Sequence, residues 1–313
     1  MTRYILHIGL HKTGTSALQS FFAANRLGLL EAGIDFPLLG RSPIDSQAHR
    51  YIASWYRRQD TEYPAGFGEV VKQGFSDAPA CVLSCEDFYF FKRGYQVDGL
   101  AKVIGSGALV ICYLRDPVSH VLSMYKERIK GNLTHSFSQV VEAYRAELED
   151  EASSYSYYSF ARNLAQWESR FKLIAAPYRR DGLVADFFER SGLRFPAGYK
   201  FEEVRSNASA SNASAIVQLA INRSLADGAL TQRAWYLLSK RVRLGEENGK
   251  VADVEPFARP ASVDMTGFIA AFRRVNGPYA NYADSSASEL LFWDTEHLDH
   301  QALTRAALDF YYQ

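Results

Sequence analysis

Short apolar runs that alternate with helix-like segments are the feature that most limits how this chain can fold. The runs Tyr4–Gly9, Ala80–Ser84 and Ala108–Leu114 are short and mostly apolar. Between them, apolar residues recur at the three- and four-residue spacing of an amphipathic helix. Strands that are apolar on both faces are typical of a parallel sheet, because helices cover both sides of such a sheet. The pattern therefore predicts an α/β fold with a mostly parallel sheet.

The length of the chain, 313 residues, fits one large domain. A chain of this size buries about 75% of the surface that its unfolded form exposes, so its core needs no disulfide or metal. The sequence has no clean linker and no repeat architecture, and we therefore expect a single domain over residues 1–313. Residues 245–313 have a weaker pattern and are expected to form helical C-terminal additions.

Charge and composition narrow the classes of function. Lys plus Arg and Asp plus Glu each number 35, so the formal net charge is zero and a general nucleic-acid binder is disfavoured. No apolar run is long enough for a membrane span, and the N-terminus lacks the features of a signal peptide. The three cysteines, Cys81, Cys85 and Cys112, lie in or beside apolar runs. They are expected to be reduced, buried side chains of a cytoplasmic protein.

A glycine-containing segment, Gly9-Leu10-His11-Lys12-Thr13-Gly14-Thr15-Ser16, joins the first predicted strand to a predicted helix. Backbone N–H groups of such a loop, together with the helix N-terminus, attract an anion. The glycine spacing matches the nucleotide-binding pattern G-x-x-x-x-G-K-[ST], but Thr15 replaces the lysine and Lys12 lies three positions earlier. A kinase needs that lysine to reach the β- and γ-phosphates. The segment therefore predicts a phosphate-binding loop in a three-layer P-loop-type fold, without the kinase arrangement.

A second motif, Arg115-Asp116-Pro117, follows the third apolar run. A strand that ends in aspartate resembles the Mg²⁺-holding strand of nucleoside triphosphatases, but the flanking residues favour another interpretation. Asp116 fits the N-cap and Pro117 the first position of a helix. Arg115 and Ser123, which follows on that helix, could converge on one phosphate, because arginine offers a charge-assisted fork and serine a hydroxyl. Taken alone, an arginine at a strand end is more often only solvated.

Together the two motifs resemble those of sulfotransferases that use 3′-phosphoadenosine 5′-phosphosulfate (PAPS). The 5′-phosphosulfate loop of that family is similar to His11–Ser16, and its Arg-Asp-Pro motif with a serine eight residues after the arginine is similar to Arg115–Pro117 with Ser123. The likeness covers about residues 3–220, and the bacterial branch near the carbohydrate sulfotransferases is most similar. The strand near Tyr178 departs from the family, because it runs into Arg179-Arg180-Asp181 instead of ending in an acidic residue.

The resemblance implies transfer of a sulfuryl group from PAPS, without a metal, to a hydroxyl of a carbohydrate or glycolipid. It implies that the donor is held by Lys12, Thr13, Gly14, Thr15 and Ser16 on its 5′ side and by Arg115 and Ser123 at its 3′-phosphate, with Lys12 also catalytic. The repeated Ser-Asn-Ala-Ser stretch that begins at Ser206 would otherwise indicate a loop and helix caps. In the family, a loop in this region contacts the 3′-phosphate and adenine, which points to Arg205 and Asn207.

Three residues are candidates for the general base. Glu86 follows the second apolar run, at the carboxyl edge where open α/β sheets bind ligands. From the residues alone, Glu86 is more often a solvated or capping carboxylate, whereas the resemblance favours a base that accepts the proton of the acceptor hydroxyl. His11, beside Lys12, is a rival, and His49, near an aromatic run, is a weaker one.

Two other functions remain open on the sequence. A small-molecule kinase of the same fold is opposed by the displaced lysine and by the Arg-Asp-Pro motif. A nucleotide-binding module without catalytic activity is favoured by the missing acidic residue after Tyr178 and opposed by Lys12 and Glu86. The basic run Lys240-Arg241-Val242-Arg243 indicates a solvated helix end, with contact to an acidic polymer as the alternative.

Overall fold

A computed structural model of the protein describes residues 2–41, 47–58, 77–91, 94–150, 156–194, 211–283 and 289–312. The backbone divides into two compact units, each built from two stretches of the chain. The first unit comprises Met1–Arg115 and Ser159–Asn207, and the second comprises Asp116–Tyr158 and Ala208–Gln313.

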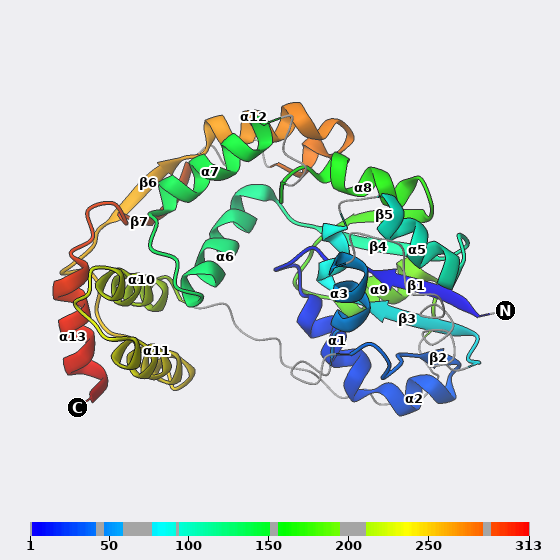
Figure 1. Ribbon diagram of the computed structural model, residues 1–313, viewed down its shortest axis with the longest axis horizontal. Coiled ribbons are helices and arrows are strands. Elements are labelled where there is room, and N and C mark those ends of the chain that lie inside the picture. The colour runs from blue at the N-terminus through cyan, green and yellow to red at the C-terminus, as the bar shows by residue number, and fades with distance from the viewer. Residues whose placement is uncertain are drawn as a thin grey trace. The chain divides into compact units, whose positions relative to one another are not determined.

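A five-stranded sheet forms the centre of the first unit (Figure 1). Its strands are β1 (Arg3–His7), β2 (Ile34–Asp35), β3 (Ala80–Ser84), β4 (Leu109–Leu114) and β5 (Lys172–Pro177). They lie in the order β2-β3-β1-β4-β5, and every pairing is parallel. The parallel sheet expected from the apolar runs is therefore confirmed, with β2 as an edge strand that the pattern did not predict.

Helices cover both faces of this sheet and complete a three-layer α/β fold. One face carries Ile5, Val82 and Ile111, and packs against α1 (Thr15–Ala24) and α9 (Leu183–Ser191). On the other side, α8 (Phe160–Glu168) contacts β5, the 3₁₀ helix η1 (Glu86–Phe90) and α5 (Gly94–Ile104). Helix α5 in turn contacts α3 (Arg50–Arg58). All three cysteines are buried free thiols, as expected, and burial raises their pKa values.

The sequence after Thr15 has helical spacing, with Leu18, Phe21 and Phe22 on one face, and Gly33 is a plausible C-cap, which predicts one helix. The structure has two helices there. The first, α1, ends at Ala24, and α2 (Arg26–Glu31) begins after Asn25. The buried Asn25 side chain donates a hydrogen bond to the Phe21 carbonyl at 2.9 Å. An asparagine amide that bonds the backbone in this way competes with the helix's own hydrogen bonds, which accounts for the break.

The second unit combines helices with a two-stranded antiparallel sheet of β6 (Pro260–Asp264) and β7 (Glu289–Trp293). Its helices are α6 (Pro117–Lys130), α7 (Phe137–Glu149), α10 (Asn212–Ala226), α11 (Gln232–Glu247), α12 (Thr266–Asn276) and α13 (His300–Tyr312), with the 3₁₀ helix η2 (Gly277–Tyr282). Residues 245–313 thus hold two strands besides the expected helices. No helix among the described residues has the length and apolarity needed to cross a bilayer.

The start of α6 agrees with the sequence. The Asp116 carboxylate accepts a hydrogen bond from the Ser119 backbone at 2.8 Å, and Pro117 is the first helical residue. The buried surface of the helix is wider than the predicted stripe. The spacing of Val118, Leu122, Tyr125 and Ile129 predicts one buried face with Ser123 on the other, but Leu122 is half-buried and Ser123 is buried.

Candidate functional site

The predicted phosphate-binding loop lies between β1 and α1, and both of its glycines are needed for its shape. Gly9 and Gly14 have positive φ angles of 106° and 74°, which disfavour any residue with a Cβ. A Cβ at Gly14 would also lie 2.5 Å from the Leu183 side chain and 3.1 Å from the Tyr178 ring. At Gly9 it would lie 3.2 Å from the Cα of Glu86. The loop is therefore tight and runs directly beside Glu86.

The N-terminus of α1 gives this loop the character of an anion site. The N-cap is Gly14, no side chain caps the helix among the described residues, and no acidic residue lies in its first turn. Such a terminus presents N–H groups and a partial positive charge. Thr13 and Thr15 donate their hydroxyl hydrogens to the Leu10 carbonyl at 2.6 and 3.0 Å. These hydroxyls close the loop itself, so the groups that face an anion are the N–H groups of the first turn.

Arg115 is brought to the same loop by the pairing of β4 with β1. Its guanidinium donates to the backbone carbonyl of Lys12 at 3.2 Å. The two segments are further joined by the Leu10 N–H, which donates to the Tyr113 carbonyl at 3.0 Å. The structure thus brings Arg115 beside this loop, although Lys12 and Arg115 lie 103 residues apart in the sequence.

Glu86 lies just beyond the carboxyl end of β3 and is held from two sides. Gln19 Nε2, on α1, donates to Glu86 Oε2 at 3.2 Å and also to the Ser84 hydroxyl at 3.2 Å. Arg50, at the start of α3, donates to Glu86 Oε1 at 3.2 Å, and its Nε lies 3.6 Å from Asp87 Oδ2. The Glu86 side chain is 14% exposed, so the carboxylate remains reachable while its position is fixed.

The surroundings of Glu86 favour its ionised form. Burial is the largest single influence and opposes ionisation, but His11, the Glu86 backbone N–H, Gln19 and Arg50 together outweigh it. The pKa of the Glu86 carboxyl is therefore below its ordinary value. At neutral pH the group is a carboxylate that accepts hydrogen bonds.

His11 belongs to the same cluster. Its Nε2 lies 3.9 Å from Asp87 Oδ1, and its ring lies beside Phe90 with a centroid distance of 5.2 Å. Burial, together with the Arg50 and Lys12 cations, lowers the pKa of His11 by more than the nearby Glu86 and Asp87 carboxylates raise it. A neutral imidazole beside the loop keeps His11 as the rival base.

His49 is a structural residue, because both of its ring nitrogens are bonded to the backbone. The Ser84 N–H donates to Nδ1 at 3.1 Å, so Nε2 carries the proton and donates to the Pro37 carbonyl at 3.0 Å. The side chain is fully buried, and burial lowers its pKa to about 3. No lone pair is left to accept a proton from a substrate, which removes His49 as a candidate base.

Three members of the cluster, Gln19, Arg50 and His7, were not predicted from the sequence. His7, the last residue of β1, is fully buried and its Nδ1 lies 2.8 Å from the Ser84 hydroxyl. Gln19 could have been found from the sequence, because it is a polar residue on the buried face of the helix that follows the loop. Arg50 could not have been found in this way, because no pattern in its own segment indicates a contact with Glu86.

The other three predicted donor-binding residues are Ser123, Arg205 and Asn207. Ser123 belongs to α6 in the second unit, and its buried hydroxyl has no hydrogen-bond partner among the described residues. Its contact with the donor stays a prediction. Arg205 and Asn207 lie outside the residues that the structure describes.

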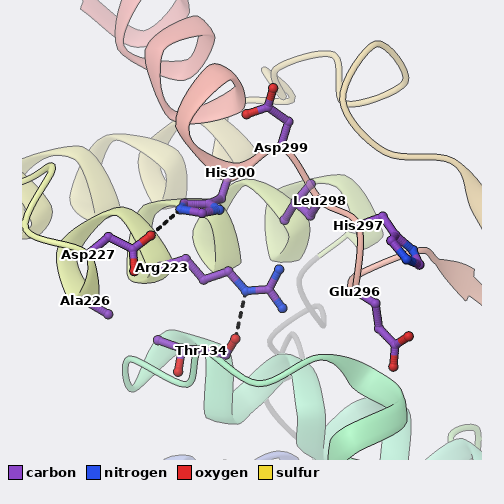
Figure 2. Close-up of a pocket in the computed structure, with 9 residues that line it drawn as sticks. All are labelled: Thr134, Arg223, Ala226, Asp227, Glu296, His297, Leu298, Asp299 and His300. Carbon is purple, nitrogen blue, oxygen red and sulfur yellow. Dashed lines mark hydrogen bonds and ion pairs between the residues drawn. The ribbon is translucent and has the colours of Figure 1, made fainter.

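The second unit has a pocket of its own, in which the charged groups are largely paired (Figure 2). Arg223 Nε, on α10, donates to the Thr134 carbonyl at 2.8 Å. His300 Nε2, at the start of α13, lies 2.6 Å from Asp227 Oδ2. These contacts join α10 to α13 and to the turn before α7, so they stabilise the unit. None of the predicted site residues that the structure describes lines this pocket.

Comparisons with family models, with curated proteins and with solved structures found no match to this chain. Within the described part of the chain, no group of three or more His, Cys, Asp or Glu side chains could hold a metal ion. Any function assigned to the protein therefore depends on the geometry of the loop cluster and on the resemblance of its motifs.

Proposed function

We propose that the protein is a PAPS-dependent sulfotransferase that sulfates a hydroxyl of a carbohydrate or glycolipid. The observation that carries this proposal is the hydrogen bond from Arg115 to the Lys12 carbonyl, because it brings the two halves of the resemblance to one loop. The position of Glu86 beside Gly9 adds an ionised carboxylate to the same place. A phosphate loop, two cations and a carboxylate are the groups that such a transfer needs.

In this proposal the loop holds the donor through charge. The N–H groups at the start of α1 and the Lys12 side chain bind the 5′-phosphosulfate, and Arg115 binds the 3′-phosphate. The donor supplies an activated sulfuryl group with a phosphate as its leaving group. Lys12 and the helix terminus stabilise the charge that develops on the leaving oxygen.

Glu86 takes the part of the general base. The acceptor oxygen forms a bond to sulfur while the bond from sulfur to the 5′-phosphate oxygen breaks, and the electron pair of that bond stays on the phosphate oxygen. The proton of the acceptor hydroxyl passes to a Glu86 carboxylate oxygen. Gln19 and Arg50, which touch the two oxygens of that carboxylate, are positioning residues.

The test compares two ligands by thermal unfolding. Adenosine 3′,5′-bisphosphate should raise the melting temperature, because a ligand that binds only the native state stabilises it, whereas ATP with Mg²⁺ should not. Arg115→Ala should lose most of this stabilisation. Chelation of divalent metals should leave sulfate transfer intact. Hydrolysis or transfer from ATP that requires Mg²⁺ would instead establish a kinase, and bisphosphate binding without any sulfate transfer would establish a binding module.

A further inference from the structure

The outer face of α11 carries large apolar side chains that the fold does not bury. Tyr236, Leu237 and Leu244 are 57%, 42% and 46% exposed. The same helix buries Leu238 and Val242 on its opposite side. The core contacts of α11 are therefore made by Leu238 and Val242, and Leu237 and Leu244 lie outside that core.

The apolar face continues onto the end of α13. Tyr312 is 49% exposed, and α13 contacts α11. Arg241 links the two helices, because its guanidinium lies 4.7 Å from the centre of the Tyr312 ring and donates to the Tyr311 carbonyl at 3.2 Å. We call the surface formed by Tyr236, Leu237, Lys240, Arg243 and Leu244 of α11 with Tyr312 of α13 the α11–α13 patch.

Basic side chains lie among these apolar ones. Lys240 and Arg243 are exposed on α11, as are Arg233 and Arg241. The acidic residues of the helix, Glu246 and Glu247, are confined to its last turn. Glu247 is exposed on the same face, four residues after Arg243, but the basic side chains outnumber it. This face of α11 is therefore apolar with a net positive charge, although the whole chain has a formal net charge of zero.

We propose that the α11–α13 patch docks the protein onto the surface of an anionic lipid bilayer. Leucine and aromatic side chains enter the boundary between headgroups and acyl chains, while lysine and arginine pair with anionic headgroups. A second copy of the chain is a poor occupant, because a two-fold interface would oppose the same cations. A soluble polyanion would use the cations and leave the leucines in water. The proposal does not depend on the sulfotransferase assignment.

The experiment measures binding of the full chain to phosphatidylcholine vesicles with and without phosphatidylglycerol. The native protein should sediment with the anionic vesicles only, and added salt should weaken the binding. K240Q/R243Q should lower the partition coefficient about tenfold or more, since each basic residue near an anionic surface contributes roughly fivefold. L237S/L244S should lower it by a similar factor, and equal melting temperatures should show that both variants fold.

A matched control removes two exposed lysines from the first unit. K102Q/K172Q makes the same change in charge, because both side chains are exposed, and it should leave vesicle binding unchanged. Equal binding of the native protein to neutral vesicles, or an equal loss in the control, would overturn the proposal. The proposal would also be overturned if the protein bound heparin but not vesicles, and if L237S/L244S left the heparin binding intact. A dimer that dissociates when the patch is altered would assign the patch to a second copy instead.

Discussion

At the scale of single residues, the proposed chemistry depends on the carboxylate of Glu86. Glu86→Gln keeps the shape of the side chain and removes its basicity. Turnover should fall by about two orders of magnitude or more, because a positioned general base contributes roughly 10²–10⁴-fold. Binding of adenosine bisphosphate should change little, since the donor is held by the loop and Arg115. The measurement is transfer of labelled sulfate from PAPS, beside thermal shifts with the bisphosphate.

Two further variants show whether Glu86 itself is responsible. Asp87→Asn alters the neighbouring carboxylate, which also lies near Arg50, and should have a much smaller effect. Arg50→Gln removes one of the groups that lower the Glu86 pKa, so the acid limb of the pH–rate profile should move to higher pH. Near-normal turnover in Glu86→Gln would show that Glu86 is not the general base, and His11 would then be the candidate.

The residues of this cluster differ in how far the sequence could predict them. Glu86 was placed correctly at the carboxyl edge of the sheet because an apolar strand precedes it. Its partners Gln19 and Arg50 lie 67 and 36 residues away, so no local pattern connects them. The rejection of His49 depends on the Pro37 carbonyl, a contact that only the folded chain shows.

At the scale of elements, Asn222 ties α10 to its neighbours. Its Nδ2 donates to the carbonyls of Ile129 and Leu133 at 2.7 and 2.9 Å. Its Oδ1 accepts from Gln218 Nε2 at 3.0 Å and from Trp235 Nε1 at 2.9 Å. The side chain is 1% exposed, so it makes all four of its hydrogen bonds without water.

Asn222→Ala should therefore lower the free energy of unfolding by about 3 kcal/mol or more, because each buried partner left unsatisfied costs roughly 1–3 kcal/mol. Urea unfolding measures the loss. Asn248→Ala is the control, since exposed Asn248 makes one side-chain hydrogen bond, to the Leu244 carbonyl. That change should stay below about 1 kcal/mol. A similar loss in both variants would contradict the network.

Elements with a strong apolar pattern were predicted, and those without one were not. β3 has the predicted bounds, Ala80–Ser84, and every residue in it is buried. β6 escaped prediction because its residues are exposed or half-buried and it begins with a proline. β2 has two residues, too few for any periodicity. The sequence therefore predicts the central sheet, where burial is uniform, but not the short or exposed strands.

At the scale of the whole molecule, the chain builds its second unit from two separate stretches. It leaves the first unit after Arg115 and returns at Ser159. The first of these crossings falls inside the Arg-Asp-Pro motif, between β4 and the cap of α6. No change of composition marks this point, because the same residues end a strand and begin a helix. The sequence pattern therefore carries no sign of the two units.

The free energy of unfolding of the whole molecule should fall at acid pH because His7 and His49 are buried. Burial lowers their pKa values to about 4 and about 3, whereas an unfolded histidine titrates near 6.5. Below pH ~6.5 the unfolded chain binds protons that the native protein excludes, so stability rises with pH. It is fully present above that pH and is lost as the pH falls toward 4. Each histidine contributes about 1.4 kcal/mol per pH unit within this window.

The measurement is the urea midpoint as a function of pH for the native protein and for His7→Asn. The asparagine amide can replace Nδ1 in the contact with Ser84 but does not titrate, so the slope between pH ~6 and pH ~4.5 should become shallower by about one proton. Carboxylates contribute equally to both curves and cancel in the difference. His297→Asn is the control: this exposed histidine has a pKa raised by Asp294, so its stabilisation is lost as the pH rises, and its removal cannot make the acid slope shallower. Parallel curves for the native protein and His7→Asn would show that His7 is not a buried neutral group.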